Sequence, residues 1–347
     1  MIKPFQPQRR TVLKRIVQYS VLGLLTLSSS LVGSLVQSTQ AQTATELNLA
    51  YQGSGDPVKS KKVIELRFKA LYPNVKVNWV GPFAAGPQLI KALNEGKVDI
   101  GTVGETPPIF DQAARPGLIP EVVYLTGRTP TDGTGQGIVV KANSPIKKVA
   151  DLKGKKIAFQ VGSNAQYLLA KALQEVGLKI SDIQIVASTP TEARDAFLQG
   201  KADAWVAGDP LLAAVENTTP IRNLRNAKGI NTLNGFYIGR RAFVTQNLQF
   251  VRVFLEEAEK VGEALEKNPS DYAKLLVDEQ KLDPAVALKV ASRRTYKLRK
   301  ITPALIDLQQ GVADFYFDQK VIPVKVDIKQ GVLSDLQYKA ITPDNIK

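Results

Sequence analysis

Two acidic residues occupy matching places in two similar stretches of the sequence. Glu105 follows a glycine in Gly104-Glu105-Thr106-Pro107, and Asp209 follows a glycine in Gly208-Asp209-Pro210. Paired carboxyl groups whose surroundings separate their pKa values are the equipment of many hydrolases. The chain has no histidine and no cysteine, so Ser-His and Cys-His nucleophiles are excluded and the usual zinc ligands are missing. We therefore favour a binding role for both acids, as helix caps or as contacts to water or to the amine of a ligand.

Both acids end a repeated unit of strand, Gly-Ser loop, helix, strand, helix, strand and Gly-acid loop. Gly96 and Gly200 are expected to end corresponding helices, and they precede Gly104 and Gly208 by the same interval. In the first copy, the pattern predicts strands over 47–51, 75–80 and 98–103 and helices over 61–72 and 88–94. In the second copy, it predicts strands over 156–160 and 183–187 and a helix over 165–176.

The glycine loops of such a unit should lie at the carboxyl ends of parallel strands, where open α/β sheets bind ligands. A helix that begins there offers free N–H groups and about half a positive charge. Two facing sets of loops would hold a small anion without a buried arginine. The candidate helix N-termini are Ser54–Gly55, Gly86–Gln88, Thr106–Pro108, Ser163–Asn164, Thr189–Thr191 and Asp209–Pro210. A single loop of this kind is more often a plain helix cap, and it is the duplication that favours a binding site.

The composition indicates a globular protein with a basic balance. Of the 347 residues, 44% are hydrophobic, and the formal net charge is +14. Residues 1–41 hold five basic residues and no acidic one, so the rest of the chain carries +9. A basic protein could bind nucleic acid, but the basic residues are scattered. We interpret the densest run, Arg293 to Lys300, as a solvent-exposed helix face or helix end.

Residues 1–41 have the three parts of a secretory signal peptide. Lysines and arginines precede an uncharged stretch over 16–45, and small residues lead to Ala41, after which we expect cleavage. Arg9-Arg10-Thr-Val-Leu-Lys14 resembles a twin-arginine export signal, and a Sec signal fits equally well. No later stretch reaches the apolar length of a membrane-spanning helix. Export makes nucleic-acid binding improbable.

The exported chain should form two lobes joined by two crossover segments. The stretch 127–137, rich in Gly, Thr and Pro, marks the passage out of the first lobe, and the extended stretch 233–241 marks the return. From Asn247 onward, helical patterns dominate, and we expect this block to return to the first lobe. The predicted division is a signal peptide at 1–41, lobe 1 at 42–130 and 236–347, and lobe 2 at 131–235.

Several of these stretches resemble the periplasmic aliphatic-sulfonate-binding proteins of ABC importers. The motifs cover nearly all of the exported chain and are Leu47–Gln52, Phe83 with Gly86-Pro87-Gln88, Gly104–Phe110, Asn143–Lys147, Ala150–Gly154, Phe159-Gln160 with Gly162-Ser163, Ala202–Trp205 with Asp209-Pro210, and Val321–Ile328. The resemblance implies an α/β, two-lobed, type II periplasmic-binding-protein fold that closes on a sulfonate and delivers it to an inner-membrane permease. The chain departs from the family at Val161, where lysine is common, and at Gly208, where tryptophan is common. These departures leave taurine, nitrate and related anions open as ligands.

The predicted ligand-binding residues lie mainly in the glycine loops, with aromatic residues to wall an apolar tail. They are Gln52, Ser54, Gly55, Phe83, Gly86, Gln88, Gly104, Glu105, Thr106, Gly162, Ser163, Asn164, Asp209 and Tyr237. Trp205 and Phe159 could join this wall, although core packing is expected for both. We predict a monomer with no catalytic residue, metal, cofactor or nucleic-acid partner. The alternative is an enzyme of the same fold, acting on a carbon–sulfur bond or a pyrimidine, which would depend on Glu105, Asp209, lysines and tyrosines.

Overall fold

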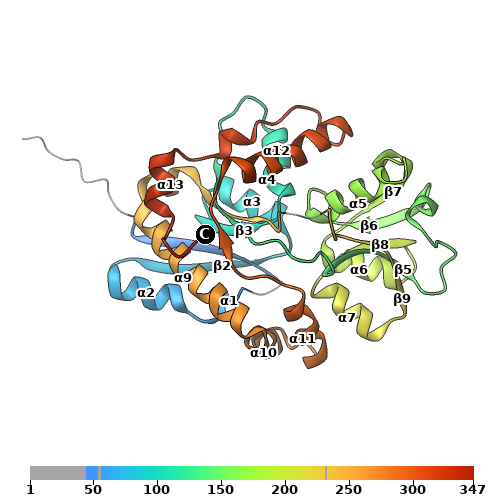
Figure 1. Ribbon diagram of the computed structural model, residues 1–347, viewed down its shortest axis with the longest axis horizontal. Helices are drawn as coiled ribbons and strands as arrows, with labels where there is room; N and C mark the ends of the chain where they lie inside the picture. The colour runs from blue at the N-terminus through green and yellow to red at the C-terminus, as the bar shows by residue number, and fades with distance from the viewer. Residues whose placement is uncertain (1–43, 54–55, 231–232) are drawn as a thin grey trace, which may run out of the picture. The chain divides into compact units, whose positions relative to one another are not determined.

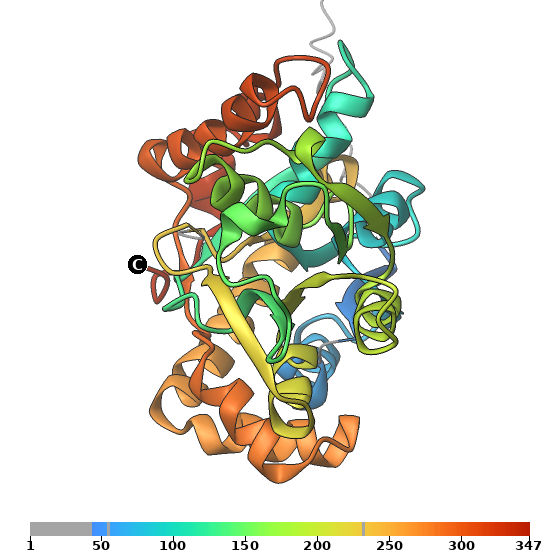
Figure 2. The same ribbon diagram turned by 90° about the vertical axis from the view of Figure 1, so that its right-hand side faces the viewer.

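The computed structural model describes residues 44–53, 56–230 and 233–347 as an α/β protein built on two mixed sheets (Figures 1 and 2). The predicted signal peptide at 1–41 and the predicted site residues Ser54 and Gly55 lie outside the described residues. In the described part, none of the helices is both long enough and apolar enough to cross a lipid bilayer. The α/β class predicted from the repeated strand and helix patterns is confirmed.

The first sheet has six strands in the order β11-β4-β10-β3-β1-β2. Their bounds are β1 Glu46–Gln52, β2 Lys76–Phe83, β3 Ile100–Val103, β4 Val122–Arg128, β10 Phe236–Arg240 and β11 Leu298–Arg299. The second sheet has five strands in the order β7-β6-β8-β5-β9. Their bounds are β5 Gln136–Lys141, β6 Lys156–Phe159, β7 Gln184–Ala187, β8 Ala204–Gly208 and β9 Ile221–Asn226.

Apart from the short edge strand β11, the two sheets have the same strand order. Strands β2, β1, β3, β10 and β4 of the first sheet correspond in turn to β7, β6, β8, β5 and β9 of the second. This correspondence agrees with the repeat read from the sequence. The strands of the repeated unit are parallel, as predicted, whereas β10 is antiparallel to β3 and β4, and β5 is antiparallel to β8 and β9. The chain reaches β5 from the first sheet and β10 from the second sheet. Each of these two strands therefore begins at the side of its sheet where the neighbouring strands end.

Helices follow the strands as the repeat requires. Those of the first copy are α1 Pro57–Ser60, α2 Val63–Leu71, α3 Gly86–Asn94 and α4 Thr106–Ala114, and those of the second are α5 Asn164–Gln174, α6 Pro190–Leu198 and α7 Leu211–Thr218. Side chains fix several starts: the Ser163 hydroxyl accepts from the Ala165 N–H, and Thr189 and Glu192 form a capping box on α6. Short 3₁₀ helices span Val149–Leu152, Ile180–Asp182 and Ile328–Gly331.

The carboxyl-terminal block is helical. It comprises α8 Arg241–Gln246, α9 Leu248–Lys267, α10 Pro269–Gln280, α11 Pro284–Ser292, α12 Pro303–Asp318 and α13 Asp335–Ile341. Helix α9 buries Phe250, Phe254 and Leu255 in one cluster with Leu47 and Leu49 of β1. This part of the block therefore packs with the first sheet, as expected. The lobe limits at 130/131 and 235/236 stay a prediction, and every strand of each sheet falls inside one of the predicted lobes.

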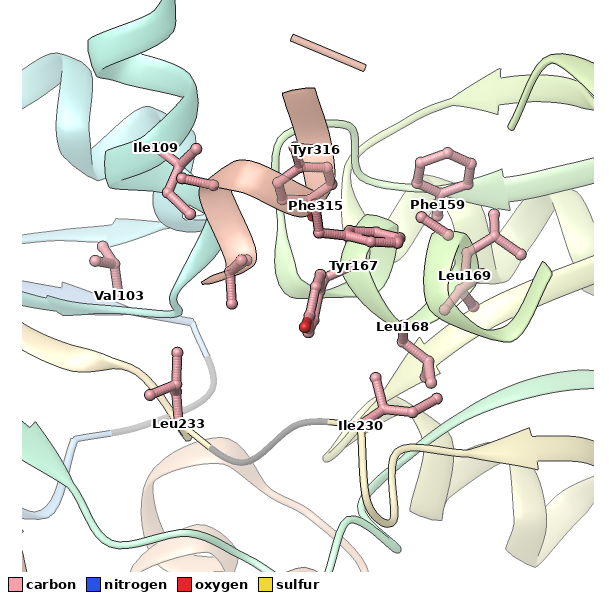
Figure 3. Close-up of a cluster of buried hydrophobic side chains, with 14 of the residues drawn as sticks. Val103, Ile109, Phe159, Tyr167, Leu168, Leu169, Ile230, Leu233, Phe315 and Tyr316 are labelled. Atoms are coloured by element: carbon pink, nitrogen blue, oxygen red, sulfur yellow. The ribbon is translucent and has the colours of Figure 1, made fainter. Parts of the chain in front are cut away.

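One buried cluster extends from the first sheet to the second through α12 (Figure 3). Tyr167 of α5 lies edge-on to two α12 side chains, with its ring centroid 5.6 Å from that of Phe315 and 5.8 Å from that of Tyr316. On its other side, Tyr316 meets Phe110 of α4 at 5.2 Å. Aromatic contacts of this geometry stabilise beyond the area that they bury. Helices α4, α5 and α12 thus connect the two halves of the protein.

Candidate ligand-binding site

A cavity of about 500 Å³ lies between the two sheets. Residues at the carboxyl ends of first-sheet strands, such as Gln52 and Val103, form one wall, and second-sheet residues such as Gly208 form the other. This is the place where open α/β sheets bind ligands, and the volume is that of a small-molecule site.

Four helices of eight residues or more begin at the wall of this cavity, besides the single-turn helix α1, whose first residue Pro57 also lines it. The lining residues Gly86, Asn164, Pro190 and Leu211 are the first residues of α3, α5, α6 and α7. The first N–H groups of a helix have no partner inside the helix, and they carry the positive end of its dipole. The four starts together favour a negatively charged guest.

Three arginines, Arg128, Arg293 and Arg294, also line the cavity. The interpretation of the run 293–300 as a solvent-exposed face was wrong for Arg293, whose side chain is only 18% exposed. Its guanidinium donates to Glu216 at 2.8 Å and to Asp209 at 3.4 Å. Arg294 donates to the Tyr272 hydroxyl at 2.5 Å. The arginines add positive charge that the sequence reasoning had not assigned to the site.

Asp209 is a buried acid in the wall of the cavity. Its side chain is 6% exposed, and its Oδ1 accepts from the Ala213 N–H at 3.1 Å. Its Oδ2 is buried without a hydrogen-bond partner among the described residues. Burial raises the pKa of Asp209 to about 6, and the guanidinium groups of Arg293 and Arg294 oppose this rise. A buried acceptor without a partner can receive an N–H or O–H group of a guest.

Glu105, the counterpart of Asp209 in the sequence, lies in a different environment. It is fully buried and is not part of the wall of the large cavity. Its Oε2 accepts from the Asn164 amide at 2.8 Å, and its backbone carbonyl accepts from the Gln309 amide at 2.7 Å. Burial raises the pKa of Glu105 to about 7. The two acids therefore have different surroundings despite their matching sequence positions.

No group of three or more acidic residues that could hold a metal ion occurs in the described parts of the chain. The arrangement of helix starts and arginines, beside the two buried acids Asp56 and Asp209, is suited to holding a small anion.

Comparison with known proteins agrees with this chemistry. Residues 74–271 match the model of a family described as NMT1/THI5 like. A putative aliphatic sulfonates-binding protein of Escherichia coli K12 is 35% identical over 313 residues, which are 89% of this chain and 93% of the relative. The chain belongs to this family of aliphatic-sulfonate-binding proteins. The resemblance stated from the sequence motifs is confirmed.

Two solved structures of aliphatic-sulfonate-binding proteins have the same fold. The alkanesulfonate-binding protein SsuA of Xanthomonas axonopodis pv. citri, bound to MOPS, is 32% identical with a TM-score of 0.77, and the match covers 84% of this chain and 99% of that one. The periplasmic aliphatic sulphonate binding protein SsuA of Escherichia coli is 34% identical with a TM-score of 0.70, covering 84% and 93%. The predicted periplasmic-binding-protein fold is therefore confirmed.

Within this family fold, half of the predicted site residues lie in the wall of the large cavity. They are Gln52, Gly86, Gly104, Ser163, Asn164, Asp209 and Tyr237. Five others do not line it: Phe83, Gln88, Glu105, Thr106 and Gly162. Two of these residues bond other parts of the protein instead. The Thr106 hydroxyl shares a hydrogen bond with the buried Tyr316 hydroxyl at 3.0 Å, and the Gly162 N–H donates to the Gln166 side chain at 2.8 Å. The ligand-binding role of the whole set stays a prediction.

The two aromatic residues expected in the core are buried. Phe159 and Trp205 are 0% and 1% exposed, and the Trp205 ring packs 5.9 Å from that of Phe197. Trp205 nevertheless contributes to the cavity wall, as does Gln160, which was named in a family motif but not among the predicted ligand-binding residues. Of the departures from the common family pattern, Gly208 lies in this wall, whereas Val161 is exposed and lies outside it.

Proposed function

We propose that this chain is the extracytoplasmic solute-binding component of an ABC importer and that it holds an aliphatic sulfonate in the cavity between its sheets. The observation that carries the proposal is the convergence of four helix starts and three arginines on one cavity. A sulfonate has one negative charge spread over three oxygen atoms, which suits several N–H donors better than a single ion pair. The names of the relatives and the MOPS in one of the solved structures support the same class of ligand.

The cavity wall also supports a division of the ligand into head and tail. The helix starts and arginines suit the sulfonate group, whereas Ala84, Leu211 and Tyr237 in the wall offer apolar surface to an alkyl chain. Asp209 leaves one buried oxygen for a donor on that chain. Alkanesulfonates with a terminal amine or hydroxyl, of which taurine is one, therefore fit this wall as well as simple alkanesulfonates do.

In this proposal, the protein is exported through the signal at 1–41 and acts as a monomer in the periplasm. The two lobes close when the ligand contacts both sheets, because contacts made only in the closed state shift the equilibrium towards closure. The closed form then delivers the sulfonate to a permease in the inner membrane.

Titration calorimetry of the exported form with a panel of ligands tests the proposal. The panel contains ethanesulfonate, taurine, MOPS, sulfate and nitrate. We expect at least one sulfonate to bind more tightly than sulfate and nitrate. A sample that is folded by circular dichroism but gives no heat with any sulfonate would contradict the proposal. Mass spectrometry of ligand retained during purification would identify the sulfonate independently.

A further inference from the structure

At the wall of the large cavity, a polar contact joins the two halves of the protein. Asn164, the first residue of α5, reaches across to Gly104 and Glu105, which follow β3 of the first sheet. A Cβ atom on residue 104 would lie 1.6 Å from the Asn164 Oδ1, so only glycine leaves room for this approach. We call this the Asn164–Glu105 contact. It buries a carboxyl group between the two sheets.

Groups from both halves enclose the Glu105 side chain. A second cavity, of about 270 Å³, has Glu105 in its wall together with Tyr167 of α5 and Ile230 and Leu233 near the return passage. Figure 3 shows Tyr167, Ile230 and Leu233 on the sides of this region, with Tyr316 of α12 beyond Tyr167. Because α5 belongs to the second sheet, separating the sheets would remove part of this enclosure and admit water to Glu105.

Among the residues that the structure describes, no lysine or arginine side chain pairs with the carboxyl group of Glu105. The titratable groups that face it are Tyr167 on α5, Tyr316 and Asp307 on α12, and, through Gln309, Tyr124 on β4. All are neutral or negative at neutral pH. Its Oε1 is buried without a hydrogen-bond partner among the residues that the structure describes. A buried charge without a partner is far more costly than a neutral carboxylic acid in the same place.

We propose that closure of the two lobes on a sulfonate is coupled to the uptake of one proton by Glu105. The proposal rests on the proposed function, because the ligand is what closes the lobes. In the closed form, the Asn164–Glu105 contact and Tyr167 shield the carboxyl group, which then favours its neutral state. In an open form, water replaces these groups and the ionised state becomes favourable again. Glu105 does not line the ligand cavity, so it acts as a positioning residue that tunes affinity through closure.

The direction of the effect follows from the pKa of Glu105 in the two forms. Burial raises this pKa to about 7, whereas an exposed glutamate has the ordinary value of 4.5. The closed form therefore binds more protons between pH 4.5 and 7, and ligand affinity should rise as the pH falls through this window. The steepest dependence expected for one proton is about tenfold in affinity per pH unit. Below the window, the affinity should level off.

The test measures the affinity for ethanesulfonate, whose charge is constant from pH 5 to 8, in the unaltered protein and in Glu105→Gln. Glutamine keeps an oxygen that can accept from Asn164, and it cannot ionise. We expect the affinity of the unaltered protein to rise towards pH 5, and that of Glu105→Gln to vary less and to exceed that of the unaltered protein at pH 8. Asp209 titrates in the ligand cavity, so both proteins are also compared in an Asp209→Asn background.

Proton counting gives a second measurement that does not require Glu105→Gln to fold. Binding heats at pH 6, in buffers of different ionisation enthalpy, report the protons taken up per ligand. We expect uptake of a substantial fraction of one proton in the Asp209→Asn protein. Two results would overturn the proton coupling while leaving the proposed function intact. One is sulfonate binding by the Asp209→Asn protein without proton uptake, and the other is the same pH dependence of affinity in Glu105→Gln as in the unaltered protein. Absence of sulfonate binding at every pH would instead overturn the proposed function.

Discussion

The side-chain amide of Asn164 donates to the carboxyl group of Glu105 across 2.8 Å and so joins the second sheet of the protein to the first. The two residues are 59 positions apart in the chain. Their contact depends on Gly104, because any side chain there would occupy the place of the Asn164 amide.

Gly104→Ala should weaken sulfonate binding, because the added Cβ atom would displace Asn164 and separate the sheets at this point. A buried polar group that loses its hydrogen-bond partner costs about 1–3 kcal/mol, so we expect a loss of about fivefold to a hundredfold in affinity. Calorimetry measures the change. Gly311→Ala is the control, since a Cβ atom there meets nothing within 4 Å. Equal affinities of the two variants would contradict this role of Gly104.

Glu105→Gln should stabilise the protein against unfolding at pH 8 but not at pH 4. The pKa of Glu105 is raised to about 7 in the folded protein, so the folded state loses stability as the pH rises from 4.5 to 7. Glutamine does not ionise and removes this loss, which amounts to about 3 kcal/mol. Urea unfolding of both proteins at the two pH values measures the difference. A difference that does not change with pH would argue against a buried, titrating Glu105.

Arg293→Gln should weaken sulfonate binding by about tenfold or more, because it removes a positive charge from the cavity wall, leaves Asp209 without its ion pair and leaves Glu216 paired with Lys289 alone. The matched control is Lys300→Gln, which removes the same charge from the exposed end of the same basic run. We expect the control to bind as the unaltered protein does. If both variants lose affinity equally, the effect comes from net charge and not from the cavity.

Asp209→Asn should change the preference between ligands. The unpartnered Oδ2 of Asp209 can accept from the amine of taurine, and the negative charge favours that cation. We expect the affinity for taurine to fall by about tenfold relative to that for ethanesulfonate, which has no amine. Competition titrations with the two ligands give the ratio directly. An unchanged ratio would show that the amine does not contact this acid.

Local sequence patterns were sufficient for the repeated elements. Gly96 and Gly200 adopt positive φ angles of 71° and 74° after α3 and α6, as expected of residues that end helices. The predicted helices 88–94 and 165–176 correspond to α3 and α5 within a few residues. These helices and their ends are determined by residues that are close together in the sequence, so the sequence alone was sufficient to predict them.

Other features depend on partners that are distant in the sequence. The strand pattern of β10 does not reveal that it inserts between β3 and β4, because alternation of side chains is the same in parallel and antiparallel strands. Arg293 reaches Asp209, 84 positions away, only because α11 packs against α7. Glu105 and Asp209 have equivalent motifs, and it is Asn164 and α12 that bury one of them away from the cavity.

The position of β10 has a consequence for biosynthesis. This strand fills the gap between β3 and β4, yet the ribosome makes it only after all strands of the second sheet. Until then, β3 and β4 each present an unpaired edge, which is the kind of surface that promotes aggregation of nascent chains. The first sheet cannot be completed by an amino-terminal fragment, so truncations that end before residue 236 should leave it split.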